Sequence, residues 1–227
     1  MADKTTKLDL ADVTDSASLP AGTFSTWARR TRSAVADKAT ADVPCGTCIA
    51  CCTSSYFIHV GPEEKDALRA IPKALLFPAP GLPKGNVLMG YDEQGRCPML
   101  KNGQCSIYEN RPKTCRNYDC RVFTAAGIES DGRDLINRQI RRWKFSYATP
   151  VDRTEHEAAQ TAAKFLRDNA DRFPRGAIPT GATQLAILAV RVFDVFLEAN
   201  AAARTDYETV EAIVAKMAEF EDSGSSL

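Results

Sequence analysis

The sequence predicts an α+β fold that is mainly α, in which an irregular cysteine-rich metal-binding half with short β-hairpins packs on a helical C-terminal half. Three observations support this class. All eight cysteines of the 227-residue chain lie between Cys45 and Cys120. Proline, glycine and turn sequences are dense in the same segment. After Cys120, apolar residues recur at the spacing of amphipathic helices.

We expect the chain to divide into four segments. These are a mobile N-terminal arm (1–42), a cysteine-cluster metal-binding domain (43–125), a helical region (126–222) and a tail (223–227). The arm is rich in Ala, Thr, Ser, Asp and Lys and shows weak periodicity, so it has little apolar surface to bury. Within it, one docking turn is expected around Phe24 and Trp27.

Short strands and turns are predicted for the cysteine-rich segment. Residues 55–60 are aromatic and β-branched and favour a strand. A helix is expected to begin at Gly61-Pro62, since proline suits the first helical position and two acids follow it. Prolines and glycines over 72–86 indicate a loop. Two tight turns then predict a small meander of three strands, 87–91, 96–100 and 104–107.

Four helices are predicted after the cysteines. The first covers 132–145, and the second opens at a capping box of Thr154 and Glu157. The third and fourth follow apolar stripes that comprise Leu185, Leu188, Ala189, Val192 and Phe196, and then Tyr207, Val210, Val214, Met217 and Phe220.

Composition narrows the class of protein. The 29 basic and 29 acidic side chains cancel, which does not favour a nucleic-acid partner. The N-terminus lacks the apolar region of a secretory signal. The longest apolar stretch, 185–197, contains Arg191 and Asp194 and is too short to span a bilayer. We therefore expect a cytoplasmic protein with no membrane partner.

In a reducing cytosol, closely spaced thiols are metal ligands more often than disulfides. The first cluster reads C-x2-C-x2-C-C, and two intervening residues let successive sulfurs face one centre. Three close cysteines are typical of an iron–sulfur cubane, although the bacterial ferredoxin run continues differently. Because neighbouring side chains diverge, Cys51 and Cys52 do not serve one ion equally. Either Cys52 ligates a second centre, or one of the pair is a redox-active thiol.

The second group is formed by Cys97, Cys105, Cys115 and Cys120, with seven, nine and four residues between them. Eight thiolates make one or two centres, and spacing alone does not divide them. The cofactor is an iron–sulfur cluster or Zn²⁺, and the three-cysteine run slightly favours the cluster. At least one nearby cation is expected to stabilise thiolates, from the set Arg111, Lys113, Arg116 and Arg121.

These residues resemble a known family. The blocks CGTCIACC, RCPML and GQCSIYENRPKTCRNYDC are similar to the CxxCxxCC cysteine-cluster proteins, a bacterial family of zinc- or iron-chelating domains. The resemblance covers Cys45 to Cys120 and implies that all eight cysteines are metal ligands: Cys45, Cys48, Cys51, Cys52, Cys97, Cys105, Cys115 and Cys120. It implies metal chelation without an assigned reaction. A similar segment occurs in flagellin lysine methylases, which implies that the module can sit inside an enzyme.

Other candidate residues are interpreted structurally. His59 is more readily a strand histidine than a ligand, and His156 receives no role. Tyr108 and Tyr118 flank cysteines, and packing explains them best. The basic stretch 138–144 reads as a helix face with Trp143 turned to the core. The sequence has no P-loop, no dinucleotide-binding glycine motif and no G-x-S-x-G elbow.

The sequence therefore predicts a metal-binding protein whose partners are metal ions. The alternative is an iron–sulfur-dependent enzyme, either an oxidoreductase or a protein-modifying enzyme, that uses the centre for chemistry. A catalytic site would keep a thiol or a coordination position open, and the Cys51-Cys52 pair is the one hint of it. A metal chaperone or reservoir is a third possibility. The sequence identifies no protein partner.

Overall fold

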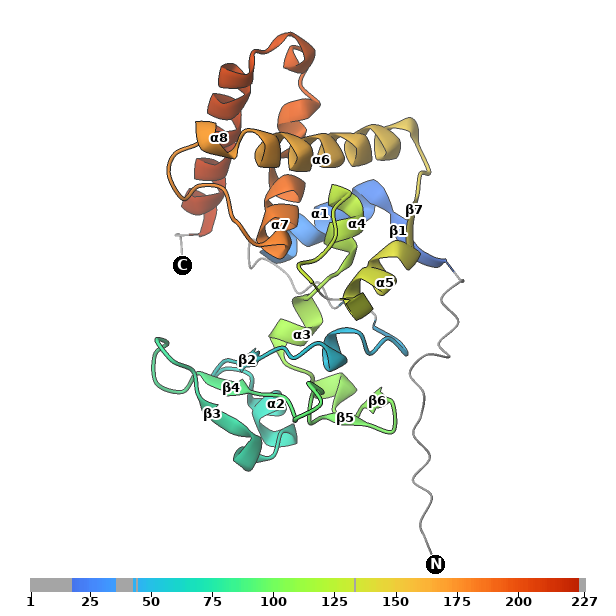
Figure 1. Cartoon of the computed structure of the whole chain (residues 1–227), viewed down its shortest axis with the longest axis vertical. Coiled ribbons are helices and arrows are strands. Elements are labelled where there is room, and N and C mark those ends of the chain that lie inside the picture. The colour runs from blue at the N-terminus through green and yellow to red at the C-terminus, as the bar shows by residue number, and fades with distance from the viewer. Residues whose placement is uncertain (1–17, 36–42, 44, 133, 225–227) are drawn as a thin grey trace, which may run out of the picture.

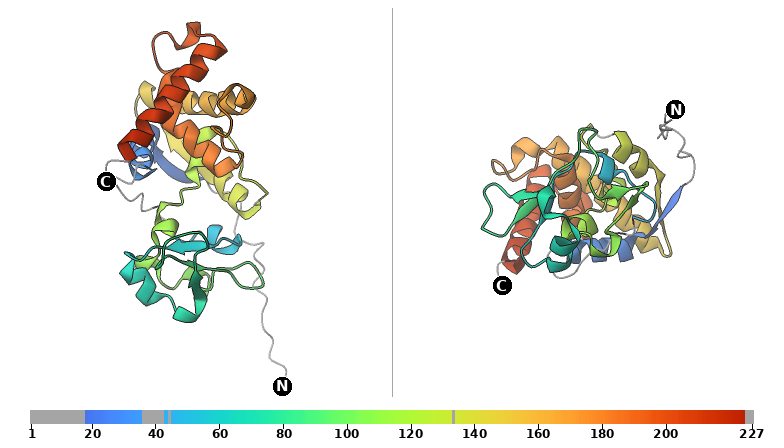
Figure 2. Two further views of the ribbon diagram at one scale, coloured as in Figure 1. Left: turned by 90° about the vertical axis from the view of Figure 1, so that its left-hand side faces the viewer. Right: turned by 90° about the horizontal axis from the view of Figure 1, so that it is seen from below.

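The chain folds into a helical body and a smaller cysteine-rich body that lie one above the other in Figures 1 and 2. The structure is a computed structural model, which describes residues 18–35, 43, 45–132 and 134–224. The predicted α+β, mainly α, class is confirmed. In the described part of the chain, no helix has the length and apolar character needed to cross a membrane.

The helical body combines the N-terminal segment with everything after Cys120. Its elements are β1 (Leu19–Thr23), α1 (Phe24–Val35), α4 (Arg121–Ala126), α5 (Asp134–Arg142), β7 (Trp143–Ser146), α6 (Pro150–Asp168), α7 (Ala182–Val192) and α8 (Asp206–Gly224). Short 3-10 turns follow α6 and α7, and a third precedes α8: η5 (Ala170–Arg172), η6 (Phe193–Phe196) and η7 (Ala201–Ala203). Helices α4, α6 and α7 pack on one another around a core that includes Phe123, Ala159 and Leu166, each fully buried.

The N-terminal segment is part of this core, which corrects the expectation of a mobile arm for residues 19–35. Strand β1 pairs in parallel with β7, with Leu19 opposite Trp143. Phe24 is fully buried, and its ring stacks on the ring of His156 at 4.6 Å between centroids. Composition concealed this helix because its buried residues, such as Phe24 and Trp27, occupy one face between many polar ones. Residues 1–17 and 36–42 of the expected arm lie outside the described residues.

The long helix α6 begins four residues before the predicted capping box. Thr149 is its N-cap, and Asp152 accepts hydrogen bonds from the Thr149 backbone N–H (2.8 Å) and hydroxyl (3.0 Å). Pro150 takes the first helical position. Both threonines are followed three residues later by an acid, and Pro150 favours the earlier start. The hydroxyl of Thr154 donates to the carbonyl of Pro150 within the helix.

The helix predicted over 132–145 is shorter than expected. It ends at Arg142, and residues 143–146 form β7 because β1 is available to pair with them. The third and fourth helices are confirmed as α7 and α8, with η6 continuing α7 to Phe196. Helix α8 reaches Gly224, so the predicted tail from 223 begins inside it. The side chain of Phe220 lies outside the described residues.

The cysteine-rich body consists of short elements around a small core. They are η2 (Cys51–Thr53), β2 (Ile58–Val60), α2 (Lys65–Ala70), η3 (Lys73–Leu75), β3 (Leu76–Pro78), β4 (Val87–Met89), β5 (Leu100–Lys101), β6 (Gln104–Cys105), η4 (Tyr108–Asn110) and α3 (Lys113–Asn117). The core is formed by five buried residues: Val60, Ala67, Ile71, Met89 and Met99.

The predicted three-strand meander is wrong in its pairing. Strand β4 lies between β2 and β3, while β5 and β6 form a separate hairpin. Strand β3 falls inside the segment expected to be a loop. Helix α2 starts at Lys65 rather than at Pro62, because the Glu64 carboxylate accepts hydrogen bonds from the backbone of Gly61 and of Lys113. This second bond ties α2 to α3, which carries Cys115.

The burial of Phe24 gives a direct test of the N-terminal segment. Phe24→Ala should lower the free energy of unfolding by about 3–5 kcal/mol, because it opens a cavity among buried rings. Chemical denaturation of the full chain measures this change. Thr26→Ala, on the exposed face of the same helix, should change it by less than about 0.5 kcal/mol. Equal, small effects of both substitutions would contradict the packing of α1.

The ionised carboxylate of Asp152 should make the free energy of unfolding depend on pH in the acid range. Hydrogen bonds from Ser25 and then from Thr149 lower the pKa of its carboxyl to about 2, so the carboxylate stabilises the fold above the ordinary pKa of about 3.9. This contribution is lost as the pH falls from about 4 to about 2. The difference in free energy of unfolding between wild type and Asp152→Asn should therefore shrink over that range. A difference that stays constant would contradict it.

Candidate metal centre

Seven of the eight cysteines line one cavity of about 130 Å³ in the cysteine-rich body. They are Cys45, Cys48, Cys51, Cys52, Cys97, Cys105 and Cys115. The eighth, Cys120, is buried at the junction with the helical body, where its residue is the N-cap of α4. All eight are free thiols. The structure thus brings together two groups of cysteines that are 45 residues apart in sequence, from Cys52 to Cys97.

Local backbone geometry places the first group around the cavity. Gly46 has φ +54°, and the Cys48 N–H donates to the Cys45 carbonyl at 2.9 Å, which closes a tight turn. Cys51 and Cys52 are consecutive in the 3-10 turn η2, so their side chains point in different directions. The Cys97 N–H donates to the Cys52 carbonyl at 2.7 Å. That bond fixes the second group against the first.

The second group is carried by three elements. Cys105 lies on β6, opposite Leu100 of β5. Cys115 lies in the middle of α3, and Cys97 lies in the turn before β5, where the Leu100 N–H bonds the Cys97 carbonyl at 2.9 Å. None of these elements is longer than five residues, so the thiols themselves occupy the interior that a larger core would fill.

The adjacent thiols of Cys51 and Cys52 face different neighbours. Burial is the main cause of the raised pKa of Cys51, and the thiols of Cys120 and Cys48 raise it further. Burial also raises the pKa of Cys52, to about 12, but its strongest cysteine neighbours are Cys97 and Cys105. The strongest cysteine influence on each of these two thiols therefore comes from a different group of cysteines.

The remaining cysteines complete this division. Burial is the main cause of the raised pKa of Cys115, and the thiols of Cys97 and Cys52 are the next causes. By their strongest mutual influences, Cys52, Cys97, Cys105 and Cys115 form one neighbourhood, and Cys48, Cys51 and Cys120 form the other. Weaker influences cross this division, from Cys45 and Cys48 on Cys52 and from Cys52 on Cys51. Cys45 is influenced by both neighbourhoods, by Cys48 more strongly than by Cys105.

The sulfurs surround the cavity without converging on one point. Among the described residues, no group of three or more His, Cys, Asp or Glu side chains is arranged to hold a metal ion. The donor set itself is purely thiol, which suits Zn²⁺ and iron–sulfur clusters and not hard cations such as Ca²⁺. The residues present therefore fit such a centre in their chemistry.

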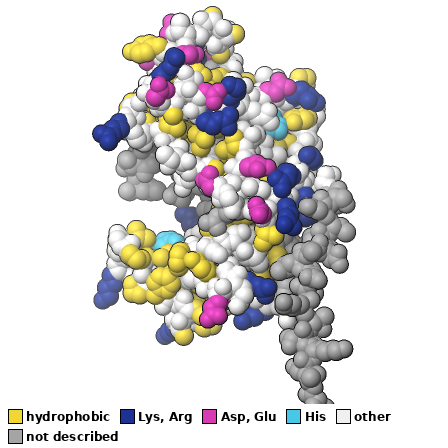
Figure 3. Space-filling model, in the orientation of Figure 1, with side chains coloured by type: hydrophobic (Ala, Val, Ile, Leu, Met, Phe, Trp, Pro, Cys, Tyr) yellow, Lys and Arg dark blue, Asp and Glu magenta, His cyan; other side chains and the backbone are white. Residues whose placement is uncertain are grey.

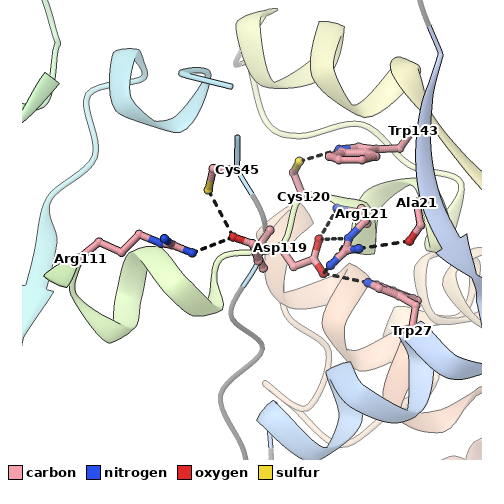
Figure 4. Close-up of polar contacts among 9 residues, drawn as sticks. Ala21, Trp27, Cys45, Arg111, Asp119, Cys120, Arg121 and Trp143 are labelled. Carbon is pink, nitrogen blue, oxygen red and sulfur yellow. Dashed lines mark hydrogen bonds and ion pairs between the residues drawn. The ribbon is translucent and has the colours of Figure 1, made fainter. Parts of the chain in front are cut away.

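Arg111 lies near Cys45 of the first group. The sequence predicted that at least one cation would stabilise a thiolate in this way. The Arg111 guanidinium lowers the pKa of Cys45, against the larger effect of burial. It donates to the Val43 carbonyl at 2.9 Å, one of the bonds drawn beside Cys45 in Figure 4. It also lies over the Tyr108 ring at 4.0 Å, so its position is fixed. The Cys45 thiol donates to the same Val43 carbonyl at 3.6 Å.

Two further cations come from the helical body. Arg121 lowers the pKa of Cys120, and Arg142 lowers that of Cys48, in both cases against burial. Arg142 is the last residue of α5 and was not among the arginines and lysines that the sequence predicted to lie near the thiolates. Its position in the sequence does not indicate that it is close to Cys48, because α5 is brought there by packing on η2.

Hydrogen-bond donors also reach the sulfurs. Backbone N–H groups of Met99 and Leu100 lower the pKa of Cys97, and the N–H of Ala50 lowers that of Cys48, although burial outweighs both. The indole N–H of Trp143 donates to the Cys120 sulfur at 3.2 Å. Trp143 packs against the core as expected, where it is half-buried, and its indole N–H in addition reaches a cysteine.

The other candidates have structural environments. A ring nitrogen of His59 is hydrogen-bonded to Asn86 at 2.8 Å, outside the cavity lining. His156 is buried among aromatic rings, and burial lowers its pKa. The hydroxyls of Tyr56 and Tyr118 are hydrogen-bonded at 3.1 Å on the cavity wall, and burial raises the pKa of Tyr118.

An aromatic surface adjoins the cavity. Phe57 lines the cavity and is 55% exposed, and its ring contacts those of Phe77 and Tyr91 at centroid distances of 6.1 and 5.0 Å. Figure 3 shows hydrophobic side chains gathered on the surface over β3 and β4.

Comparison with known proteins identifies the cysteine-rich segment. Residues 44–139 match the family model CxxCxxCC, described as a "putative zinc- or iron-chelating domain". No curated protein matches the chain, and no solved structure matches it. The match begins beside Cys45 and ends within α5, so it includes all eight cysteines and leaves out most of the helical body.

Metal binding should release protons. Burial raises the pKa of Cys52 and of Cys120 to about 12, so the metal-free thiols are protonated at pH 7 and must lose protons to become ligands. We expect about four protons per tetrahedral Zn²⁺ and an affinity that rises with pH. Calorimetric zinc titration in buffers of different protonation enthalpy measures this release. A binding enthalpy independent of the buffer would contradict it.

Proposed function

We propose that this chain, which carries a CxxCxxCC domain over residues 44–139, binds metal in two centres of four thiolates each. The first centre is formed by Cys45, Cys48, Cys51 and Cys120. The second is formed by Cys52, Cys97, Cys105 and Cys115. One observation carries this division: the consecutive thiols of Cys51 and Cys52 face different groups of cysteines.

The number of ligands supports two centres. The neighbourhood around Cys52 already contains four thiols, which is the number that a tetrahedral zinc or an iron–sulfur cubane takes. The other neighbourhood contains three, and Cys45 completes it because Cys48 is its nearer cysteine influence. Every cysteine is then used once.

Charge is also consistent with this arrangement. Eight thiolates with two centres of charge +2 leave about −4 in total. Arg111 and Arg142 offset about half of that charge, and the charge of Arg121 is balanced by its ion pair with Asp119. Such partners hold thiolates in place and favour their ionised form.

We propose an iron–sulfur cluster for the first centre. Three of its ligands come from the close run 45–51 and one, Cys120, comes from far along the chain. This combination of three near ligands and one remote ligand is typical of cubanes. The second centre takes its ligands from four separate elements, and zinc and a cluster fit it equally well.

The first centre joins the two bodies of the protein. Cys120 belongs to the core of the helical body, whereas Cys48 and Cys51 belong to the loop and turn before β2. Because the cysteine-rich body has a core of only five buried residues, metal binding should supply much of its stability. We propose the cytosol as the protein's compartment, because closely spaced free thiols are typical of proteins kept in reducing surroundings.

With all eight thiols assigned, this arrangement favours closed centres over a catalytic one. A catalytic centre keeps a coordination position open, whereas four thiolates fill a tetrahedral site. In this arrangement every cysteine is a ligand, so none remains as a free nucleophile or redox-active thiol. An enzyme would instead show one thiol that reacts rapidly with an alkylating agent while the metal is retained. A reservoir would lose metal rapidly to a chelator.

Two serine variants test the division into centres. The measurement is metal and acid-labile sulfide content of the full chain purified without oxygen. Cys120→Ser should lose the metal of the first centre and keep the second, and Cys115→Ser should do the reverse. The double variant should lose both. Tyr108→Phe, which changes the cavity wall without removing a thiol, should keep the full content.

Loss of all metal in either single variant would mean one shared centre and would contradict the division. Unchanged metal content in both would show that these cysteines are not ligands. Iron and sulfide in equal amounts, with a brown absorption band, would support the cluster. Colourless protein with two zinc ions would support the two-centre arrangement and contradict the cluster.

A further inference from the structure

Trp143 is the one side chain of the helical body that the structure shows hydrogen-bonded to a cysteine sulfur. Its indole N–H donates to Cys120 at 3.2 Å (Figure 4). Cys120 is 8% exposed, so water competes little for this bond. Trp143 lies four residues beyond the end of the family match at 139. It is therefore a contribution of this chain's own helical body to the cysteine cluster.

Strand pairing and a cation fix the position of the indole. Trp143 is the first residue of β7 and is paired with Leu19 of β1. The guanidinium carbon of Arg121, the residue after Cys120, lies 5.7 Å from the centroid of the indole ring. Moving the indole away from the sulfur would disturb both contacts.

Arg121 is itself tightly held. It makes an ion pair with Asp119 at 2.7 Å and donates to the Ala21 carbonyl of β1 at 3.1 Å. Asp119 is buried and also accepts the indole N–H of Trp27 at 2.8 Å. Both tryptophans thus lie in one network, in which the Trp143 indole N–H donates to a sulfur and the Trp27 indole N–H donates to a carboxylate.

A donor in this position acts on a thiolate more than on a thiol. Hydrogen bonds to charged acceptors are roughly twice as strong as those between neutral groups. A fixed N–H also orients the sulfur toward the metal, and loss of such outer partners typically weakens metal binding by about 10–100-fold. The donors described above for Cys97 are backbone N–H groups, which only a substitution by proline would remove.

We propose that Trp143 is a positioning residue for the first metal centre, with its indole N–H holding the Cys120 thiolate in place as a ligand. This inference rests on the proposed function, because it takes Cys120 to be a ligand. Through Trp143, the helical body controls how tightly the first centre binds metal, while the second centre is independent of it.

The chain has only two tryptophans, so the indole N–H groups can be observed separately. In nuclear magnetic resonance spectra of the full chain with ¹⁵N-labelled tryptophan, zinc loading should shift the Trp143 indole signal strongly. The Trp27 signal should shift little. Trp143→Phe assigns the signals, and Cys120→Ser should abolish the shift. Assignment needs only one of Trp143→Phe and Trp27→Phe to fold, and a Trp143 signal in wild type that does not respond to zinc would overturn the proposal.

The affinity of each centre gives the second readout. In competition with a chelator, Trp143→Phe should weaken zinc binding at the first centre by about 10–100-fold and leave the second unchanged. With cobalt(II) in place of zinc, the sulfur-to-metal charge-transfer band of the first centre should move to lower energy, because the thiolate loses a donor. Trp27→Phe is the matched control, since it removes an indole N–H that ends on Asp119, and it should move neither quantity.

The outcomes separate this inference from the function on which it rests. Wild-type protein that binds no zinc or cobalt and also holds no iron and sulfide would contradict the proposed centres themselves. Two bound ions in wild type, with equal affinities and spectra in Trp143→Phe, would overturn the role of Trp143 alone. Equal effects of Trp143→Phe and Trp27→Phe would assign the loss to general packing and would also overturn it.

Discussion

The buried carboxylate of Asp119 is the interaction on which the junction of this protein depends. It is 7% exposed and binds Arg121 through both of its oxygens, at 2.8 and 2.7 Å. A buried carboxylate is costly unless it is paired and hydrogen-bonded, so Arg121 and Trp27 must both stay in place. Their positions in turn determine where α1 and α4 lie. Cys120, next to Asp119 in sequence, is thereby held at the boundary between the two bodies.

This junction explains why the N-terminal segment belongs with the C-terminal helices. Arg121 donates to the carbonyl of Ala21 in β1, and β1 pairs with β7, which carries Trp143. The cysteine-rich body is thus inserted between two parts of one folded unit. Its own core is small, and its short elements are connected by turns and by backbone bonds between the two cysteine groups. Metal ligation is the additional interaction that such a body needs.

Sequence patterns predicted the class of fold, the cysteine-rich segment and the helical second half. They also predicted that Cys51 and Cys52 could belong to different centres, because adjacent side chains diverge. The proposed assignment of the other six could not come from sequence, since the spacing of Cys97 to Cys120 is compatible with several divisions. Trp143 could not be found from sequence, because it reaches Cys120 only through the parallel pairing of β7 with a strand more than 100 residues earlier.

The errors in the predicted elements have similar physical causes. Thr149 and Thr154 both carry the capping pattern, and the choice between them depended on Pro150. The three strands expected to pair in sequence do not, because β4 pairs with β2 and β3 and leaves β5 to pair with β6.

The turn that carries Cys51 and Cys52 has a consequence for how the protein fills with metal. The two sulfurs share one short stretch of backbone, so a metal bound on one side of η2 restricts the turn and reduces the entropy that the other side must still lose. By linkage, the same free energy of coupling acts in both directions. Because this coupling arises only from the backbone of a three-residue turn, it favours the filling of both centres and still allows either one to bind metal without the other.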